Sequence, residues 1–341
     1  MKKTFLIACT ALLVSLGSCA QKKNGHALAV AFYNCENLFD TQHDPGKNDE
    51  EFTPEGKYHY TENIYHKKLH NIATAIQQLG TDEVAEGPAI IGLAEIENGH
   101  VLNDLISQPE IADRHYQYAW FDGPDERGID VAMLYNPRYF KLIKATPLHV
   151  DLSGMGDKET TRDVLHVQGV MGGDTVDVFV NHWPSRRGEE GESDAKRATA
   201  AKVDRDAIDA IMKYKPNAKV IVMGDLNDNP TDISVTQALG AKGDKNIGMN
   251  ELYDPMAELY NNGQGTLAYK HHWDLFDQII FSGAFLKHVG KLQFGHAEIF
   301  NKDFLVDHYK HFEWQPHRSF AGMRWINGYS DHFPVVVYLS K

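Results

Sequence analysis

The chain has 341 residues, of which 42% are hydrophobic and 24% charged, and 47 acidic residues against 34 lysines and arginines give a net charge of −13. This is the composition of an ordinary globular protein with enough length to bury a large core. The negative charge argues against a broad basic face that grips long polyanions. It leaves open a phosphate-bearing substrate, because a bound divalent metal supplies positive charge locally.

Residues 1–18 are predicted to be a secretory signal peptide. A basic start at Lys2 and Lys3 precedes the apolar run FLIACTALLVSL, which is too short to span a membrane as a mature helix. The tetrapeptide LGSC ends at Cys19 and resembles a bacterial lipobox, in which cleavage precedes the cysteine and its sulfur is lipidated; a plain signal with an incidental cysteine is the alternative. With a lipobox, residues 19–27 form a tether that acyl chains hold to the bacterial cell envelope, at the outer membrane or surface.

The three cysteines are distributed in a way that suits an exported protein. Cys9 is removed with the signal and Cys19 carries the lipid, so that Cys35 alone remains in the folded part. We therefore expect no intramolecular disulfide, and the fold must rely on the size of its hydrophobic core.

Strand and helix patterns alternate irregularly along residues 28–341. We expect strands at 28–39, 88–98, 129–137, 218–227, 276–282 and 332–340, a hairpin over 165–183, helices at 62–80, 101–106 and 195–214, and loops at 41–61 and 185–194. No change in composition marks a domain boundary within this range. The pattern favours an α+β fold, an α/β sandwich in which two stacked sheets are flanked by helices in a single domain.

Polar side chains stand at the ends of most of the predicted strands. The stretch IVMGDLNDNP carries Asp225 and Asn227 two residues apart, either because they begin a turn or because the alternation of a strand aims both into a site. Similar residues recur at seven strands in all: Asn34, Glu36, Glu95, Glu97, Asp130, Asn181, His182, Asp225, Asn227, Asp274, Asp277, Asp331 and His332. So many polar strand ends with few lysines predict one site assembled from many edges.

The residue types at these ends suit a narrow range of chemistry. Carboxylates and amides are hard oxygen ligands, which Mg²⁺ and Mn²⁺ prefer. The chain has no HExxH motif and no closely spaced cysteine pair in its folded part, so a zinc site is disfavoured. His182 and His332 add acid–base capacity near neutral pH. Metal, histidine and aspartate together indicate hydrolysis of a phosphate ester.

Eight short motifs follow one another along the chain: N-x-E from Asn34, AEIEN around Glu95, RGIDVAMLY, TRD with Arg162, NHWPSR with His182, GDLND, DQIIFS from Asp277 and the terminal SDH. In this order they resemble the endonuclease/exonuclease/phosphatase family, which includes pancreatic-type deoxyribonucleases, apurinic endonucleases, neutral sphingomyelinases and inositol polyphosphate 5-phosphatases. The resemblance spans roughly residues 28–340. It implies a four-layer deoxyribonuclease-like fold, with two stacked, mostly antiparallel sheets, helices outside, and the site at one end of the sandwich.

The resemblance also implies a metal and its ligands. Glu95 is similar to the family's principal metal ligand. Asn34, Glu36 and Asp331 are similar to its supporting ligands, some of which act through water. The implied cofactor is Mg²⁺, or Mn²⁺ in its place.

Four residues resemble the family's centre of reaction. His332 is similar to the residue that takes a proton from the attacking water, and Asp277 to the carboxylate that fixes its tautomer. Asp225 and Asn227 resemble the pair beside the attacked phosphorus. Asn227 would hold a phosphoryl oxygen, and Asp225 would either orient water or handle the proton of the leaving group.

Two more residues complete the implied catalytic set. His182 is similar to a second histidine, which bonds a phosphate oxygen or protonates the leaving group, and Arg162 to an arginine that contacts the phosphate. In this interpretation the strand at 218–227 ends in DLN because its alternation presents a carboxylate and an amide together to one phosphate.

The leading hypothesis is a metal-dependent phosphoesterase that cleaves phosphodiester or phosphomonoester bonds by in-line attack of a water activated at His332. An exported nuclease is favoured, acting on nucleic acid or small organophosphates. Sphingomyelinase-like or inositol-phosphatase-like phosphoesterases are alternatives, as is a non-catalytic phosphate-binding module that kept the fold. We expect a monomer that is anchored to a membrane through Cys19, with its domain in the periplasm or outside the cell.

Overall fold

The computed structural model describes residues 28–341 apart from 156–159, 187–190, 192, 271 and 310–313. The predicted signal peptide, the tether and Cys19 therefore lie outside the described residues. No helix within those ranges combines the length and the apolar character needed to cross a membrane. Cys35 is buried and its thiol is free.

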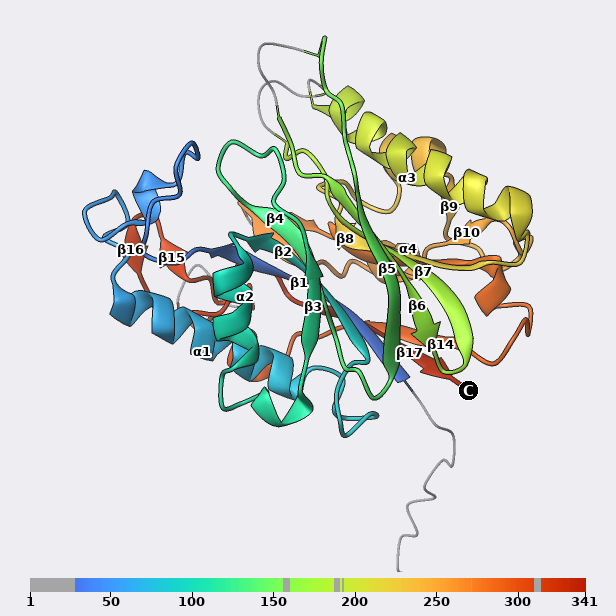
Figure 1. The fold of residues 1–341 in the computed structure, drawn as a ribbon, viewed down its shortest axis with the longest axis horizontal. Helices are drawn as coiled ribbons and strands as arrows, with labels where there is room; N and C mark the ends of the chain where they lie inside the picture. Colours follow the sequence, from blue (N-terminus) through green and yellow to red (C-terminus); the bar gives the residue numbers. More distant parts are fainter. Residues whose placement is uncertain (1–27, 156–159, 187–190, 192, 271, 310–313) are drawn as a thin grey trace, which may run out of the picture.

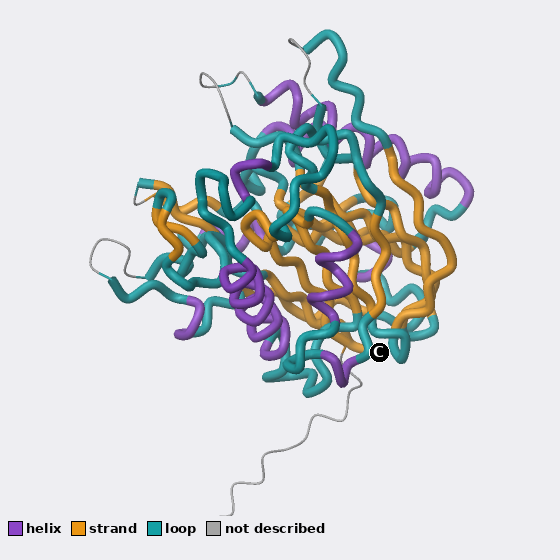
Figure 2. The backbone as a smooth tube through the Cα atoms, turned by 60° about the vertical axis from the view of Figure 1, so that its left-hand side comes forward, coloured by secondary structure: helices purple, strands orange, loops and turns teal. Residues whose placement is uncertain are grey.

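Two β-sheets are stacked at the centre of the molecule, and the helices lie outside them (Figures 1 and 2). One sheet has the order β14 (Gln293–Ile299), β17 (Val335–Ser340), β1 (Leu28–Leu38), β2 (Ile90–Ile96), β4 (Asp130–Tyr135) and β3 (Gln117–Trp120). The other has the order β5 (Phe140–Leu148), β6 (Val164–Met171), β7 (Asp174–His182), β8 (Lys219–Asp225), β13 (Asp277–Ser282), β10 (Leu252–Tyr253) and β9 (Ala241–Lys242). Neighbours are mostly antiparallel, but β1–β2, β7–β8 and β9–β10 are parallel. The predicted sandwich is confirmed, with mixed sheets.

Helices and small hairpins cover the outer faces and the ends of the sheets. Helix α1 (Glu62–Gln78) packs against β1 and α2 (Gly99–Ile106) against β3, while α3 (Asp194–Tyr214) packs against β6 and α4 (Met256–Asn261) against β13. Two hairpins pair β11 (Leu267–Tyr269) with β12 (His272–Asp274) and β15 (Phe320–Ala321) with β16 (Arg324–Trp325). Short helical turns lie at Glu50–Phe52, Ala112–Arg114, Ser234–Leu239, Gly283–Phe285 and Asp303–Leu305.

The core has two parts because successive side chains of a strand point to opposite faces. On β8, Ile221 and Met223 belong to the cluster that joins the two sheets. Val220 and Val222 belong to the cluster under α3. All four are fully buried, and burial of each such side chain stabilises the fold by about 1.5–3 kcal/mol.

The long elements lie where the sequence predicts, with boundaries that differ by a few residues. Helix α1 ends at Gln78 instead of Gly80, and α3 begins at Asp194, one residue early. The sequence analysis did not predict β3, β5 or β14, which are edge strands of the two sheets. Edge strands such as β5 and β14 are half exposed and mix polar with apolar residues, so no apolar run marks them.

Gly92 on β2 marks a close approach of the two sheets. A Cβ at this position would lie 2.6 Å from Met223 Sδ and 2.9 Å from Phe32 Cδ2. We expect Gly92→Ala to lower the free energy of unfolding by about 1–3 kcal/mol in urea denaturation, because overpacking displaces these side chains. Gly248→Ala is the control, since a Cβ there meets only side-chain atoms at 3.3 Å or more, and its effect stays below about 0.5 kcal/mol. Equal losses in the two variants would contradict this account of the core.

Candidate functional site

Strand pairing brings together the polar strand ends of the second sheet. His182 at the end of β7 lies opposite Asp225 at the end of β8, and Asp225 lies opposite Asp277 at the start of β13. Strand β8 ends at Asp225, and Asn227 has a φ of 51°, so the alternation of the strand does not extend to Asn227. That part of the sequence interpretation is wrong. A turn directs the amide, and the N–H of Asn227 donates to Asp225 Oδ1 at 3.0 Å.

The first sheet supplies the other half of the site from the ends of β1 and β2. Asn34 Nδ2 donates to Asp225 Oδ2 at 3.0 Å and lies 3.4 Å from Glu95 Oε1, so this amide connects the two sheets. Glu95 Oε2 accepts a hydrogen bond from the Asn37 N–H at 2.7 Å. Glu36, Asn37 and Glu95 have φ values of 50°, 54° and 62°. Such left-handed backbone is uncommon outside glycine and clusters at functional sites.

His332 and Asp277 form a buried pair at the centre of the site. His332 Nδ1 lies 2.7 Å from Asp277 Oδ2, while Nε2 lies 3.9 Å from both Asp225 Oδ2 and Asp331 Oδ1. Burial lowers the pKa of His332, but the charge and hydrogen bond of Asp277, followed by the charges of Asp225 and Asp331, hold that pKa well above its usual range. Asp277 thus fixes the ring, and Nε2 is the nitrogen directed to the other carboxylates.

Asp225 lies between the two histidines. Its Oδ2 is 3.7 Å from His182 Nε2 and 3.9 Å from His332 Nε2. His182 Nε2 is also 3.8 Å from Glu95 Oε1. Burial and the charge of Asp277 raise the pKa of Asp225 to about 7, although His332 opposes the shift. Two imidazole groups, an amide and several carboxylates therefore meet in one small volume, as proton transfer and metal binding both require.

The carboxylates of Glu36, Glu95 and Asp331 fit the ligand set of a hard divalent cation. Glu36 Oε2 accepts a hydrogen bond from the Ser319 N–H at 2.6 Å. Burial and then the negative charge of Asp331 raise the pKa of Glu36 to about 7. Carboxylate and amide oxygens are the donors that Mg²⁺ and Mn²⁺ prefer, and the oxygen of Asn34 accepts the Glu36 N–H at 2.9 Å. These residue types suit the metal that the sequence predicts. In the described part of the chain, the ligand atoms of this site that lie within 4.8 Å of one another are those of Asp225, Asp277 and His332, whereas Glu36, Glu95 and Asp331 form no such group.

Lys68 on α1 is a buried cation behind these carboxylates that sequence reasoning missed. Burial lowers its pKa, whereas the charges of Glu36, Asp331 and Glu95 raise it. Its Nζ donates to Ser319 Oγ, the residue whose N–H binds Glu36. The signal was present in the sequence, because Lys68 lies four residues from both Ile64 and Ile72 and thus on the apolar stripe of the helix.

Arg162 lies inside the molecule, next to the strand that carries His182. Its Nε donates to the carbonyl of His182 at 3.0 Å, its NH2 group donates to the carbonyl of Trp183 at 2.5 Å, and its NH1 group lies 3.1 Å from Asp125 Oδ2. Contact of Arg162 with phosphate stays a prediction. The hydrogen bonds of Arg162 to the His182 and Trp183 carbonyls show that Arg162 positions the end of β7.

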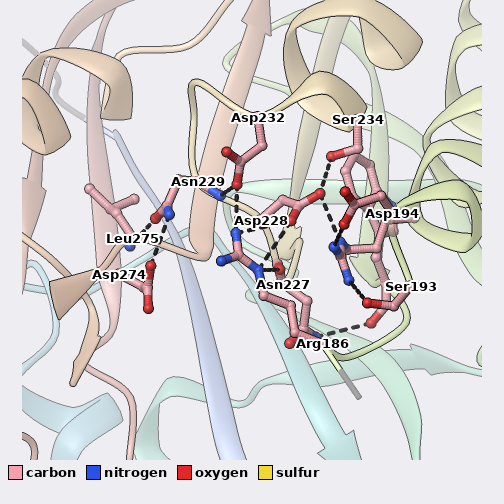
Figure 3. A network of polar contacts seen from close by, with 12 residues as sticks. Arg186, Ser193, Asp194, Asn227, Asp228, Asn229, Asp232, Ser234, Asp274 and Leu275 are labelled. Carbon is pink, nitrogen blue, oxygen red and sulfur yellow. Dashed lines mark hydrogen bonds and ion pairs between the residues drawn. The ribbon is translucent and has the colours of Figure 1, made fainter. Parts of the chain in front are cut away.

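The loop after β8 is held by a polar network that sequence reasoning also missed (Figure 3). Asp228 pairs with Arg186 at 3.0 Å and accepts a hydrogen bond from Ser234 Oγ at 2.6 Å. Asn229 Nδ2 donates to Asp274 Oδ1 at 2.8 Å, and its Oδ1 accepts the Leu275 N–H at 2.8 Å. The signal in the sequence was the run NDN, whose two further polar side chains anchor the turn that carries Asn227.

Three other polar strand ends make their described contacts with loops. Glu97 Oε2 accepts the Asp40 N–H at 2.6 Å, and Asp130 Oδ2 accepts the Gly123 N–H at 3.1 Å. Asp274 supports Asn229 as described above. These residues take part in loop structure rather than in the cluster around Asp225.

Comparison with known proteins defines the class to which this fold and site belong. The sequence profile of the Endonuclease/Exonuclease/phosphatase family matches residues 29–341. The chain belongs to this family, and it is accordingly a metal-dependent hydrolase of phosphoester bonds. No curated protein sequence matches significantly.

Solved structures share the fold at low sequence identity. D. rerio TDP2 humanized by 14 mutations is 15% identical, with 92% of this chain and 99% of that chain covered and a TM-score of 0.56. D. rerio TDP2 complexed with a single-strand DNA product is 15% identical over 93% and 100% of the two chains, with a TM-score of 0.54. A mannosyl-6-phosphatase of Bacteroides thetaiotaomicron VPI-5482 is 17% identical over 92% and 99%, with a TM-score of 0.54.

Arg162 offers a test of how the site is supported. We expect Arg162→Met to lower the free energy of unfolding by about 3–5 kcal/mol, because it leaves Asp125 buried without its cation and two carbonyls without a donor. Urea denaturation measures the loss. Arg138→Met serves as the control, since Arg138 is 70% exposed in its ion pair with Glu86, and it costs less than about 1 kcal/mol. A loss at Arg162 as small as at Arg138 would refute the supporting role.

Proposed function

We propose that the cluster around Asp225 hydrolyses its phosphoester by attack of a water that His332 deprotonates. The observation that carries this assignment is the Asp277–His332 pair, in which Nδ1 is bound at 2.7 Å and Nε2 is directed toward Asp225 and Asp331. In this arrangement Asp277 holds the imidazole in one tautomer and stabilises its charge after it has taken the proton. Geometry of this kind is what a general base requires.

The remaining residues of the site are assigned by position. Glu95, Glu36, Asp331 and Asn34 would hold Mg²⁺, which when bound polarises the phosphoryl oxygen and offsets the negative charge around His332. Asn227 Nδ2 donates to the Trp183 carbonyl at 3.0 Å, and its second amide hydrogen would donate to a phosphoryl oxygen beside Asp225. His182 Nε2 lies 3.7 Å from Asp225 Oδ2, and in this proposal it protonates the leaving group.

For the substrate we propose a short or single-stranded nucleic acid, which makes the protein a nuclease. The net charge of −13 disfavours long duplexes, and Arg162 and Arg186 are both engaged by aspartates of the protein. A cavity of about 480 Å³ is lined by Trp273, Trp314 and Phe333, and Phe333 directly follows His332. Aromatic side chains at this place would stack against an unpaired base. TDP2, which shares the fold, has been crystallised with a single-strand DNA product.

A small organophosphate is the second candidate substrate. The acidic surface is less of an obstacle to a single phosphate group than to a nucleic acid strand. The mannosyl-6-phosphatase with the same fold supports this candidate.

The place of action is proposed to be the cell envelope. The sequence of residues 1–19 supports export, followed by lipidation of Cys19 and attachment to a membrane, with the domain from residue 28 in the periplasm or outside the cell. We propose that the protein acts there as a monomer. Phosphate and the other products of hydrolysis would be released at the cell envelope, where the cell can take them up.

The role of His332 is tested with bis-p-nitrophenyl phosphate in Mg²⁺ or Mn²⁺. We expect His332→Ala and Asp277→Asn each to lower kcat by about 10²–10⁴-fold, because the general base is lost or wrongly oriented, and EDTA to abolish turnover. His166→Ala is the matched control, since His166 is bonded to Asp177 at 3.0 Å in the same sheet but outside the site. Activity that persists in His332→Ala would remove the assigned base, and no activity in the unmutated chain would favour a binding module.

The aromatic cavity distinguishes the two substrates. We expect Trp314→Ala to raise KM for a single-stranded oligonucleotide by roughly 5–100-fold with little change toward bis-p-nitrophenyl phosphate, because one base loses its stacking partner. Trp314 is 72% exposed, so the substitution should leave stability unchanged, and Tyr214→Ala, also strongly exposed on α3, is the control. Faster turnover of sugar phosphates than of oligonucleotides would instead support a small organophosphate as the substrate.

A further inference from the structure

A second group of carboxylates lies on the loop that follows β1 and at the residue that follows β2. Ligand atoms of Asp44, Asp49 and Glu97 lie within 4.8 Å of one another. Asp40 adjoins them, because its N–H donates to Glu97 Oε2 at 2.6 Å. Neither the family resemblance nor the proposed mechanism gives any of these four residues a task.

Glu97 is buried in this group with an unsatisfied oxygen. Glu97 is 3% exposed, and its Oε1 atom is buried without a hydrogen-bond partner among the described residues. Asp49 and Asp40 are 2% and 8% exposed, and both oxygens of each have partners. Asp49 binds His43 and accepts the Asp44 N–H at 2.8 Å, while Asp40 accepts the Gln42 N–H at 2.7 Å and the Asn98 amide at 3.3 Å. Glu97 is therefore the carboxylate of the group with an unsatisfied oxygen, which is destabilising in a buried place unless a cation or a proton compensates it.

Described side chains supply almost no positive charge to the group. Within the described part of the chain, no salt bridge joins a lysine or arginine to Asp40, Asp44, Asp49 or Glu97. The lysines of the same loop bind elsewhere, Lys47 to Asp122 at 3.0 Å and Lys57 to Glu51 at 3.3 Å. His43 is the exception, and its Nδ1 binds Asp49 Oδ1 at the exposed side of the group.

We propose that Asp44, Asp49 and Glu97, with Asp40 beside them, bind a structural divalent cation, best matched by Ca²⁺, at a site separate from the catalytic metal. Ca²⁺ accepts six to eight oxygen ligands in irregular geometry, and a loop of carboxylates and backbone carbonyls supplies such ligands. Mg²⁺ demands a regular octahedron and keeps several waters, which suits a buried group of three or four carboxylates less well.

The consequence of such a site is control over the shape of the catalytic strand end. Asn37 N–H donates to Glu95 in β2 and Asp40 N–H donates to Glu97 just after β2, so these two glutamates hold successive parts of the segment that follows Glu36. A cation at Glu97 would fix this segment without touching substrate. It therefore acts on the catalytic carboxylates through the backbone.

Calcium binding to the full chain tests the proposal independently of catalysis. The Glu95→Gln background weakens the catalytic metal site, and EDTA followed by dialysis removes bound metal. We expect isothermal titration with CaCl₂ to show binding in this background, and excess CaCl₂ to raise Tm by about 5 °C through preferential binding to the folded chain. Adding Asp44→Asn should weaken Ca²⁺ binding at least tenfold and remove most of the rise in Tm.

Two further variants make the outcome decisive. Asp44 is half-buried on a loop, and its carboxylate has no hydrogen bond among the described residues, so Asp44→Asn leaves the apo fold intact. Glu97→Gln is not used, because Glu97 accepts the Asp40 N–H at 2.6 Å and the substitution disturbs that bond. Glu55→Gln, an exposed acidic residue downstream in the same region, is the control and should bind Ca²⁺ normally. Absence of Ca²⁺ binding in Glu95→Gln, or binding that Asp44→Asn and Glu55→Gln alter equally, would overturn the proposal whatever the catalytic assays show.

Discussion

The site depends on one hydrogen bond that joins the two sheets, from Asn34 Nδ2 to Asp225 Oδ2. Asn34 ends the regular pairing of β1 with β2, and Asp225 ends β8 in the opposite sheet. Stacked sheets touch through apolar side chains, which fix their separation but have no directional preference. A polar contact at the open end of the sandwich sets the register of the strand ends, and the buried oxygen of Asp225 makes it costly to lose.

Around that contact the site concentrates negative charge in a place that water scarcely reaches. Burial raises the pKa of Asp225 and Glu36 to about 7, and the pKa of His332 rises well above its usual range because three carboxylates surround it. Such an arrangement is unfavourable for the bare protein and favourable once positive charge is added. Lys68 is the buried basic residue that α1 contributes, and burial lowers its pKa although the charges of Glu36, Asp331 and Glu95 oppose the shift. The left-handed backbone at Glu36, Asn37 and Glu95 also lowers the stability of the fold locally, and burial of the large core offsets this loss.

Most of the strands and site residues could be predicted from the sequence, because long buried strands appear there as continuous apolar runs. The apolar runs before Asn34, Glu95 and Asp225 placed those side chains at strand ends, and ordered motifs placed His332 and Asp277 with them. Edge strands such as β5 and β14 escaped prediction, since their exposed faces carry polar residues. Pairing of distant strands is not written in any local pattern, so the contacts of Asp228 and Arg162 became visible only in three dimensions.

The predicted use of the DLN stretch was partly wrong for a reason that applies beyond this chain. Alternation aims side chains only as far as the ladder extends, and the ladder of β8 stops at Asp225. Beyond it, the direction of Asn227 depends on a turn with positive φ and on anchors further along, at Asp228 and Asn229. The DLN motif was interpreted either as the start of a turn or as part of a site. Both interpretations apply, because the turn is what directs Asn227. An acidic protein can therefore bind a phosphate group. Positive charge from a lysine, an arginine or a bound metal is needed only at the few positions where turns direct the protein's own ligand groups toward the phosphate oxygens.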